Sequence, residues 1–154
     1  MLGPPGPIPS DVPHRNILPM IWVYIIKDDG RYKARYVANG APHLKGSLTL
    51  AQTYAECLEQ SGCRIFWNLS AAKNKAICGA DATNAFAEAP PPKPRLWLKV
   101  DNVYKNWWKH KTGETIDKDS YVECFHAVQG HPGSLRLWQL HIDDILSKLD
   151  FVPT

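Results

Sequence analysis

The sequence predicts an α+β fold in which an N-terminal β-hairpin and several helices pack on a small mixed sheet. Short runs rich in β-branched and aromatic residues predict strands at 21–26, 31–38, 77–80, 95–100 and 121–128. Apolar residues recur at helical spacing over 63–73 and 134–149, and shorter helical turns are expected at 50–60 and 103–110. A chain of 154 residues is long enough for one such domain.

The chain begins with a proline-rich arm. The first 20 residues hold six of the 13 prolines and no strong periodicity. Proline lacks a backbone donor and favours extended structure, so this composition predicts a disordered or extended segment. We therefore expect a disordered arm over residues 1–18 and a folded domain over 19–154.

The first two strands are joined by an Asp-Gly turn at residues 28–30, which is a strong hairpin signal. Because side chains alternate along a strand, Arg31, Lys33 and Arg35 are expected on one face, spread over roughly 13 Å. That spacing suits several backbone phosphates or one triphosphate. The alternative is a solvated strand face whose charges keep a sheet edge from aggregating.

An aspartate follows the third predicted strand, the apolar run at 77–80. A carboxylate at the end of a buried strand can hold Mg²⁺ against phosphate oxygens, and this assigns Asp81 as a candidate metal ligand and catalytic residue. Phe86 lies about one helical turn later, where its ring could press on the sugar of a bound nucleotide. The alternative is that Asp81 caps the short helix through Ala85, with Phe86 in the core.

Gln129 and Gly130 stand between the last predicted strand and a helix that begins near Ser134. A glutamine amide here could touch a base edge, and a glycine would let a nucleic-acid backbone come close. The alternative is an ordinary turn.

Paired aspartates in the last helix resemble a polymerase metal site, but the helical pattern argues against that function. Ile142, Ile145 and Leu149 share the apolar face, which leaves Asp143 and Asp144 on the solvent side.

Composition restricts the partners and the location. The net charge of +3 and pI of about 8.7 are compatible with a nucleic-acid partner. The four cysteines form no CxxC pair, and no histidine and cysteine spacing predicts a metal site. No apolar run is long enough to cross a bilayer. We expect an intracellular protein that is neither secreted nor bound to a membrane.

Taken in chain order, five segments resemble the reverse transcriptase domain of copia-type LTR retrotransposons. They read WVY at 22–24, GRYKARYVANG at 30–40, GADATNAFAEA at 79–89, AVQGHP at 127–132 and LRLW at 135–138. The likeness covers about residues 18–154. Its collinear order makes it more specific than any one segment, and it favours the functional interpretation of the hairpin, of the aspartate segment and of the glutamine–glycine pair.

The resemblance implies a partial fingers and palm fold and a role for each motif. Asp81 matches the first metal-binding carboxylate of the palm, and Phe86 matches the ring that selects deoxynucleotides by crowding a 2′-hydroxyl. Arg35, and less closely Lys33, match the fingers residues that meet the incoming triphosphate.

The remaining positions concern the nucleic acid. Gln129 and Gly130 match a segment that touches the nucleotide and the template, and Arg31 would meet the nucleic-acid backbone. The implied partners are an RNA or DNA primer–template and a deoxynucleoside triphosphate, with Mg²⁺ as the cofactor. The implied reaction is attack of a primer 3′-hydroxyl on the α-phosphate, with two metal ions about 3.5–4 Å apart.

The family's tyrosine-x-Asp-Asp hairpin has no counterpart in the sequence, nor do the thumb, connection, RNase H, integrase and protease regions. One carboxylate cannot hold two metal ions. We therefore expect a truncated fragment of an RNA-directed DNA polymerase that is inactive alone. The alternatives are a nucleic-acid-binding module without catalysis and a non-functional relic of a retroelement.

Overall fold

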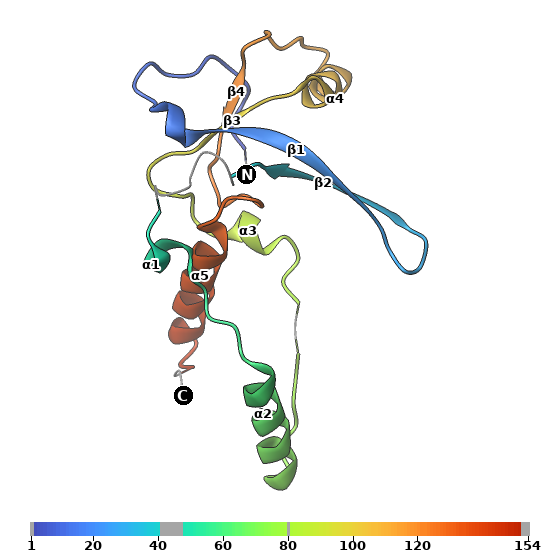
Figure 1. Ribbon diagram of the computed structural model, residues 1–154, viewed down its shortest axis with the longest axis vertical. Coiled ribbons are helices and arrows are strands. Elements are labelled where there is room, and N and C mark those ends of the chain that lie inside the picture. The colour runs from blue at the N-terminus through green and yellow to red at the C-terminus, as the bar shows by residue number, and fades with distance from the viewer. Residues whose placement is uncertain (1, 41–47, 80, 152–154) are drawn as a thin grey trace.

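The computed structural model describes residues 2–40, 48–79 and 81–151, which form an α+β fold around a mixed four-stranded sheet (Figure 1). The strands are β1 (Ile17–Ile26), β2 (Tyr32–Ala38), β3 (Trp97–Lys99) and β4 (Tyr121–Glu123). They lie in the order β2-β1-β3-β4. The β1–β2 and β3–β4 pairs are antiparallel, and the β1–β3 pair is parallel. The predicted class and the N-terminal hairpin are therefore confirmed.

The helices lie on both sides of this sheet. They are the 3₁₀ turn η1 (His14–Asn16) and the α-helices α1 (Leu50–Thr53), α2 (Gln60–Ala72), α3 (Ala85–Glu88), α4 (Asn102–Thr112) and α5 (Ser134–Lys148). Helix α4 lies on one side, and α3 lies on the other with α5, which packs against α3 and α1 (Figure 1). None of the helices in the described ranges is long and apolar enough to cross a bilayer.

The core sits where β1, β3 and β4 meet α4. Leu18, Leu98 and Val122 come from the three strands and are fully buried. Burying each such side chain contributes about 1.5–3 kcal/mol. Tyr104 of α4 joins them, and the side chain of Asp101 caps that helix by accepting a 2.8 Å hydrogen bond from the Tyr104 amide.

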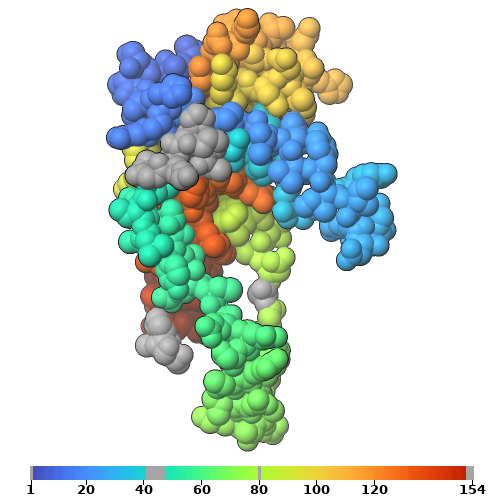
Figure 2. Space-filling view, in the orientation of Figure 1, coloured from blue at the N-terminus to red at the C-terminus, as the bar shows by residue number. Residues whose placement is uncertain are grey.

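Two parts of the molecule project from this core. Figure 2 shows the far half of the β1–β2 hairpin (blue) and helix α2 (green) standing out from the body. Several of the apolar side chains on α2 are about half exposed, including Ile65, Phe66 and Leu69. The apolar stripe expected on this helix is therefore present, but it does not join the core.

The proline-rich segment that the sequence predicts as a disordered arm runs along β4. Gly3 donates a 2.8 Å hydrogen bond to the carbonyl of Glu123, and Gly6 exchanges backbone hydrogen bonds of 3.0 and 2.8 Å with Tyr121. Strand β1 already begins at Ile17, inside the range expected for the arm. The segment thus covers the backbone edge that β4 would otherwise leave open.

The strand expected at 77–80 is not formed over the described residues 77–79, and residue 80 lies outside the described part of the chain. Residues 75–79 have no regular secondary structure, and Ile77 and Cys78 are exposed. A strand needs a neighbour for its backbone groups, and none of the described strands lies beside this segment. The described residues 75–79 that lead toward Asp81 are therefore exposed and irregular and are not a buried strand, which corrects the sequence-based expectation.

The strand expected over 121–128 ends early, at Glu123. The Cys124 amide still donates to Leu96 at 2.9 Å, but the chain then turns, and the Ala127 amide donates to Ala89 at 3.1 Å. This turn brings the segment 127–129 beside α3.

Candidate functional site

A cavity of about 670 Å³ lies between β2, the segment 81–87 that leads into α3, and the segment 127–129. Its lining brings together five of the predicted site residues: Lys33, Arg35, Asp81, Phe86 and Gln129. These residues come from three segments that are far apart in the sequence. The two remaining predicted residues, Arg31 and Gly130, are not in the lining.

The hairpin register places the two cations on one face. Lys33 pairs with Ile25, and Arg35 pairs with Val23, so both side chains leave the sheet on the same side. Lys33 is half-buried and Arg35 is exposed. Ion pairs among the described residues engage other cations, namely Arg31, Arg95, Lys99 and Lys148. The charges of Lys33 and Arg35 are therefore available to an anion in the cavity.

Arg31 does not extend this row of cations. It precedes β2, in the turn, where its Nε and Nη2 donate to the Oδ2 atom of Asp29 at 2.8 and 2.6 Å. The side-chain and backbone hydrogen bonds from Arg31 lower the pKa of Asp29. The third cation of the predicted stripe is thus paired within the hairpin turn, and two cations reach the cavity.

Asp81 is exposed on the cavity lining, across from the hairpin cations. The N-cap of α3 is Asn84, which adopts a left-handed conformation with φ of 53°. Asparagine tolerates this conformation better than most residues. The capping alternative for Asp81 is therefore not what the structure has, and its carboxylate is free of that role. Phe86 is half-buried in α3 and lines the same cavity.

Gly130 holds the segment 127–129 against β2. Its φ is +93°, and a Cβ atom at this position would lie 2.0 Å from the carbonyl oxygen of Ala38. The Ala38 amide donates to the carbonyl of Gln129 at 2.8 Å. The close backbone approach at this glycine is thus to β2 of the same chain. This approach positions Gln129 in the cavity lining, although Gly130 itself is not part of that lining.

Two supporting contacts were not found from the sequence. A Cβ atom on Gly40 would lie 2.6 Å from the Gly130 carbonyl, so the two glycines allow one chain crossing. Ser134, the first residue of α5, donates from its Oγ to the Val128 carbonyl at 2.6 Å and accepts from the Val128 amide at 3.2 Å. The hydroxyl therefore ties the cavity wall to the first turn of α5. The short polar side chain itself was the available signal.

The cavity lining offers few groups that could hold a metal ion. Asp81 is the carboxylate in the cavity lining, and no group of three or more potential metal ligands occurs within the described residues. Magnesium often uses one or two carboxylates and completes its shell with substrate phosphates and water. Asp143 and Asp144 are exposed on α5, and Asp144 pairs with Lys148, so the solvated interpretation of that pair is confirmed.

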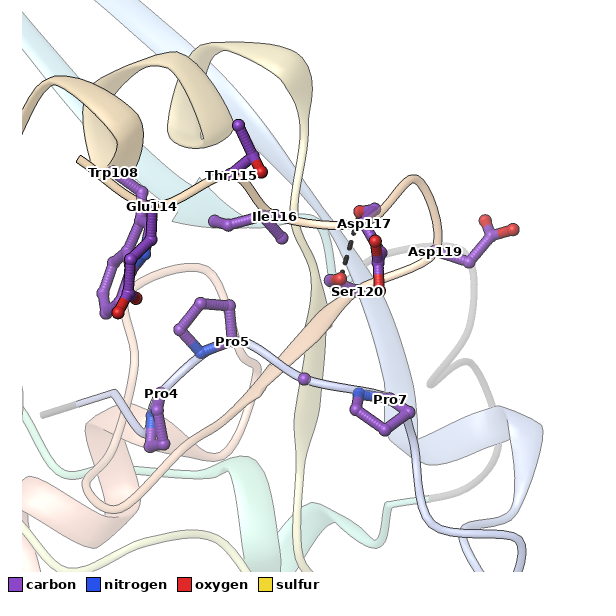
Figure 3. Close-up of a pocket in the computed structure, with 11 residues that line it drawn as sticks. Pro4, Pro5, Pro7, Trp108, Glu114, Thr115, Ile116, Asp117, Asp119 and Ser120 are labelled. Atoms are coloured by element: carbon purple, nitrogen blue, oxygen red, sulfur yellow. Dashed lines mark hydrogen bonds between the residues drawn. The ribbon is translucent and has the colours of Figure 1, made fainter. Parts of the chain in front are cut away.

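A second cavity, of about 330 Å³, lies between the proline-rich segment and the loop 114–120 (Figure 3). Pro4 and Pro5 face Trp108 across it, and the loop contributes Glu114, Asp117 and Asp119. Its lining holds carboxylates and no lysine or arginine. This lining would repel a phosphate, so the cavity beside β2 is the better candidate for an anionic ligand.

Comparisons with protein-family models, curated proteins and solved structures find no match to this chain.

Proposed function

We propose that the chain is a partial fingers and palm domain of a copia-type RNA-directed DNA polymerase. Its cavity would bind a deoxynucleoside triphosphate together with Mg²⁺ beside a primer–template. One observation carries the proposal. The residues that separate sequence motifs assign to nucleotide binding line a single cavity: Lys33, Arg35, Asp81, Phe86 and Gln129.

The charges in the cavity fit a nucleotide bound with a metal ion. Lys33 and Arg35 supply donors for phosphate oxygens, and an arginine can bind two of these oxygens at once. Asp81 would hold a Mg²⁺ ion that also contacts the phosphates and neutralises part of their charge. A lining with one carboxylate and two cations suits an anionic ligand that has a metal cation bound to it.

The apolar and amide groups suit the rest of the nucleotide. Phe86 offers a ring edge or face to the sugar, where a 2′-hydroxyl would be crowded. The side chain of Gln129 can donate and accept hydrogen bonds, as a base edge requires.

The proposal assigns nucleotide binding to this chain but not nucleotide transfer. Two-metal transfer stabilises both the attacking and the leaving oxygen, which needs more carboxylates than the cavity lining contains. Loss of one metal position removes several kcal/mol of transition-state stabilisation, hence many powers of ten in rate. We expect this chain to bind the nucleotide and to give no primer extension on its own.

The test is a titration of the purified chain with a deoxynucleoside triphosphate, with and without Mg²⁺. The double variant Lys33→Ala/Arg35→Ala should bind about tenfold more weakly or worse, because charge-assisted hydrogen bonds are lost. Arg64→Ala is the matched control, since Arg64 is an exposed cation on α2 and does not line the cavity. Equal affinities for the double variant and the control would refute the proposal.

Two further variants assign the other groups. Asp81→Asn should reduce the gain in affinity that Mg²⁺ gives the wild type, because a neutral amide is a poorer magnesium ligand. Phe86→Ala should narrow the preference for deoxynucleotides over ribonucleotides, because the space beside the sugar is opened. An unchanged sugar preference would remove Phe86 from the site.

A further inference from the structure

Helix α2 carries an apolar stripe that stays open to solvent in the described part of the chain. Its members recur at spacings of three and four residues, which places them on one side of the helix: Ile65, Phe66, Leu69 and Ala72. Ile65 is 60% exposed and Leu69 is 53% exposed. The helix has no extensive packing contact with any other described helix or strand. These residues, which we call the α2 stripe, therefore form an apolar surface that no described element covers.

The α2 stripe is extended at its start by a residue that precedes the helix. A Cβ atom on Gly62 would lie 2.7 Å from the Cδ1 atom of Leu58, so the exposed Leu58 side chain rests on the first turn. Trp67 does not belong to the α2 stripe. It is two residues away from both Ile65 and Leu69, and at about 100° per residue it lies on the opposite side of the helix.

Charges of opposite sign stand at the two ends of the α2 stripe. Glu56 and Glu59 precede the helix, and Lys73 and Lys75 follow it. All four residues are exposed, and none of them belongs to an ion pair among the described residues. Their signs also suit the dipole of the helix itself. An acidic end and a basic end thus flank one open apolar surface.

We propose that the α2 stripe binds the same stripe on a second copy of this chain, with the two helices antiparallel. In a dimer with two-fold symmetry, each contact between two different residues occurs twice. With Ile65 of one copy beside Leu69 of the other, Leu58, which rests on Gly62, meets Ala72. Apolar groups then meet apolar groups along the whole stripe, and the contact does not depend on nucleotide binding.

The same register pairs the charges. Glu59 of each copy comes beside Lys75 of the other, because the pairs Ile65–Leu69 and Glu59–Lys75 share one midpoint in the sequence. Parallel helices would instead bring like charges together at each end, which is unfavourable. The charges therefore favour the antiparallel arrangement.

The shape of the molecule leaves room for this pairing. Figure 1 shows α2 hanging from the body by its N-terminal end, and Figure 2 shows it standing clear of the body. Antiparallel pairing therefore sets the two bodies at opposite ends of the helix pair, where they do not collide.

The size of the α2 stripe predicts a weak dimer. Leu58, Ile65, Phe66 and Leu69 are each at least half exposed. Four such side chains offer on the order of 400 Å² per copy, about half of what each partner buries in a standard stable interface. We therefore expect a dimer that is half formed at a concentration on the order of tens of micromolar.

Sedimentation velocity of the full chain at rising concentration tests the proposal. Ile65→Gln/Leu69→Gln should raise the midpoint of dimer formation at least about tenfold, because polar amides replace apolar contacts. Trp67→Gln is the matched control. Trp67 is 57% exposed on the opposite side of α2, so this variant should keep the wild-type midpoint. Circular dichroism checks that each variant keeps its helix content.

A charge reversal tests the orientation of the helices. Glu59→Lys and Lys75→Glu should each weaken the dimer, because like charges then meet between the copies. The double variant should recover the wild-type midpoint. Within one copy the two residues lie at opposite ends of a 13-residue helix. That separation is about 20 Å at 1.5 Å per residue, which is beyond the reach of an exposed ion pair at physiological salt. The recovery can therefore arise only between copies.

A wild type that stays monomeric at about ten times the expected midpoint would overturn the proposal and leave the α2 stripe to a different partner. A loss in Trp67→Gln as large as that in Ile65→Gln/Leu69→Gln would overturn it as well, since the stripe would not be the contact. A double charge variant that stays as weak as the single variants would contradict the antiparallel register.

Discussion

The two faces of the β1–β2 hairpin differ in what they carry and in what covers them. One face presents Lys33 and Arg35 to a cavity that the segments 81–87 and 127–129 complete. The other face presents the rings of Trp22, Tyr24 and Tyr36, of which Tyr36 packs against Tyr104 of α4 and also lines the cavity. The period of two in a strand lets the short sequence at 31–36 supply both chemistries at once. The cavity beside the cationic face therefore depends on how the segments 81–87 and 127–129 pack, whereas an exposed ring such as Tyr24 depends mainly on the hairpin itself.

The largest effect is expected where both faces share their support. Leu98 is fully buried in β3, between β1 and β4. Leu98→Ala should lower the free energy of unfolding by about 3 kcal/mol, through lost burial and the cavity left behind. Urea denaturation measures this change. A loss below about 1 kcal/mol would show that the sheet core is not what holds the two faces together.

A change at the chain crossing should affect the cationic face selectively. Gly130→Ala places a Cβ atom against the Ala38 carbonyl at a backbone conformation with φ of +93°, so we expect a loss of about 2 kcal/mol. Nucleotide affinity should fall as well, because Gly130 positions Gln129 at the cavity. Gly79→Ala is the control, because a Cβ atom there meets nothing within 4 Å. Equal stability of the two variants would argue against a close approach between Gly130 and Ala38.

Lowering the pH should destabilise the fold near the same chain crossing, because the buried His131 directly follows Gly130. Burial lowers the pKa of His131 from 6.5 to about 4, and its Nδ1 accepts a 3.2 Å hydrogen bond from the Gly133 amide. The unfolded chain therefore binds this proton more readily than the folded chain does. The stability contributed by neutral His131 is complete above about pH 6.5 and is lost as the pH falls toward 4.

Urea denaturation at several pH values between 6.5 and 4 measures this loss. His131→Gln should flatten the dependence in that range, whereas His110→Gln, at an exposed position of α4, should not. A wild-type dependence that survives in His131→Gln would assign the effect to other groups.

The smallest effect is expected at Arg31, and it tests whether Arg31 belongs to the cationic face that binds the triphosphate. Arg31 is paired with Asp29 in an exposed turn, and such pairs contribute little to stability. Arg31→Ala should leave the unfolding midpoint and the triphosphate affinity close to those of the wild type, whereas Arg35→Ala should weaken binding. Isothermal titration of the two single variants makes the comparison. Similar losses in both would show that the row of three cations acts as a unit.

The sequence predicts the hairpin and the face on which its cations lie because both depend on local signals. An Asp-Gly turn fixes the register, and the register fixes the face on which Lys33 and Arg35 lie. The grouping of Asp81 and Gln129 with these cations rested on motif order, since no local rule brings distant segments together.

Other features depend on tertiary contacts that periodicity does not report. An apolar run such as 77–80 predicts a strand only if a neighbouring strand is present, and none of the described strands lies there. Arg31 lies in the alternating pattern, yet its nearest carboxylate, two residues away, determines its contact. The stacking of Tyr36 on Tyr104 could not be predicted, because it needs both the strand register and the placement of Tyr104 on α4.

The central claim is that the cavity beside β2 binds a nucleotide, and amide NMR of the isotope-labelled chain tests it most directly. Adding a deoxynucleoside triphosphate with Mg²⁺ should shift the backbone resonances of residues 33–35, 81–87 and 127–129, which line that cavity. Shifts confined to the acidic cavity around residues 114–120, or no saturable shifts at all, would contradict the claim.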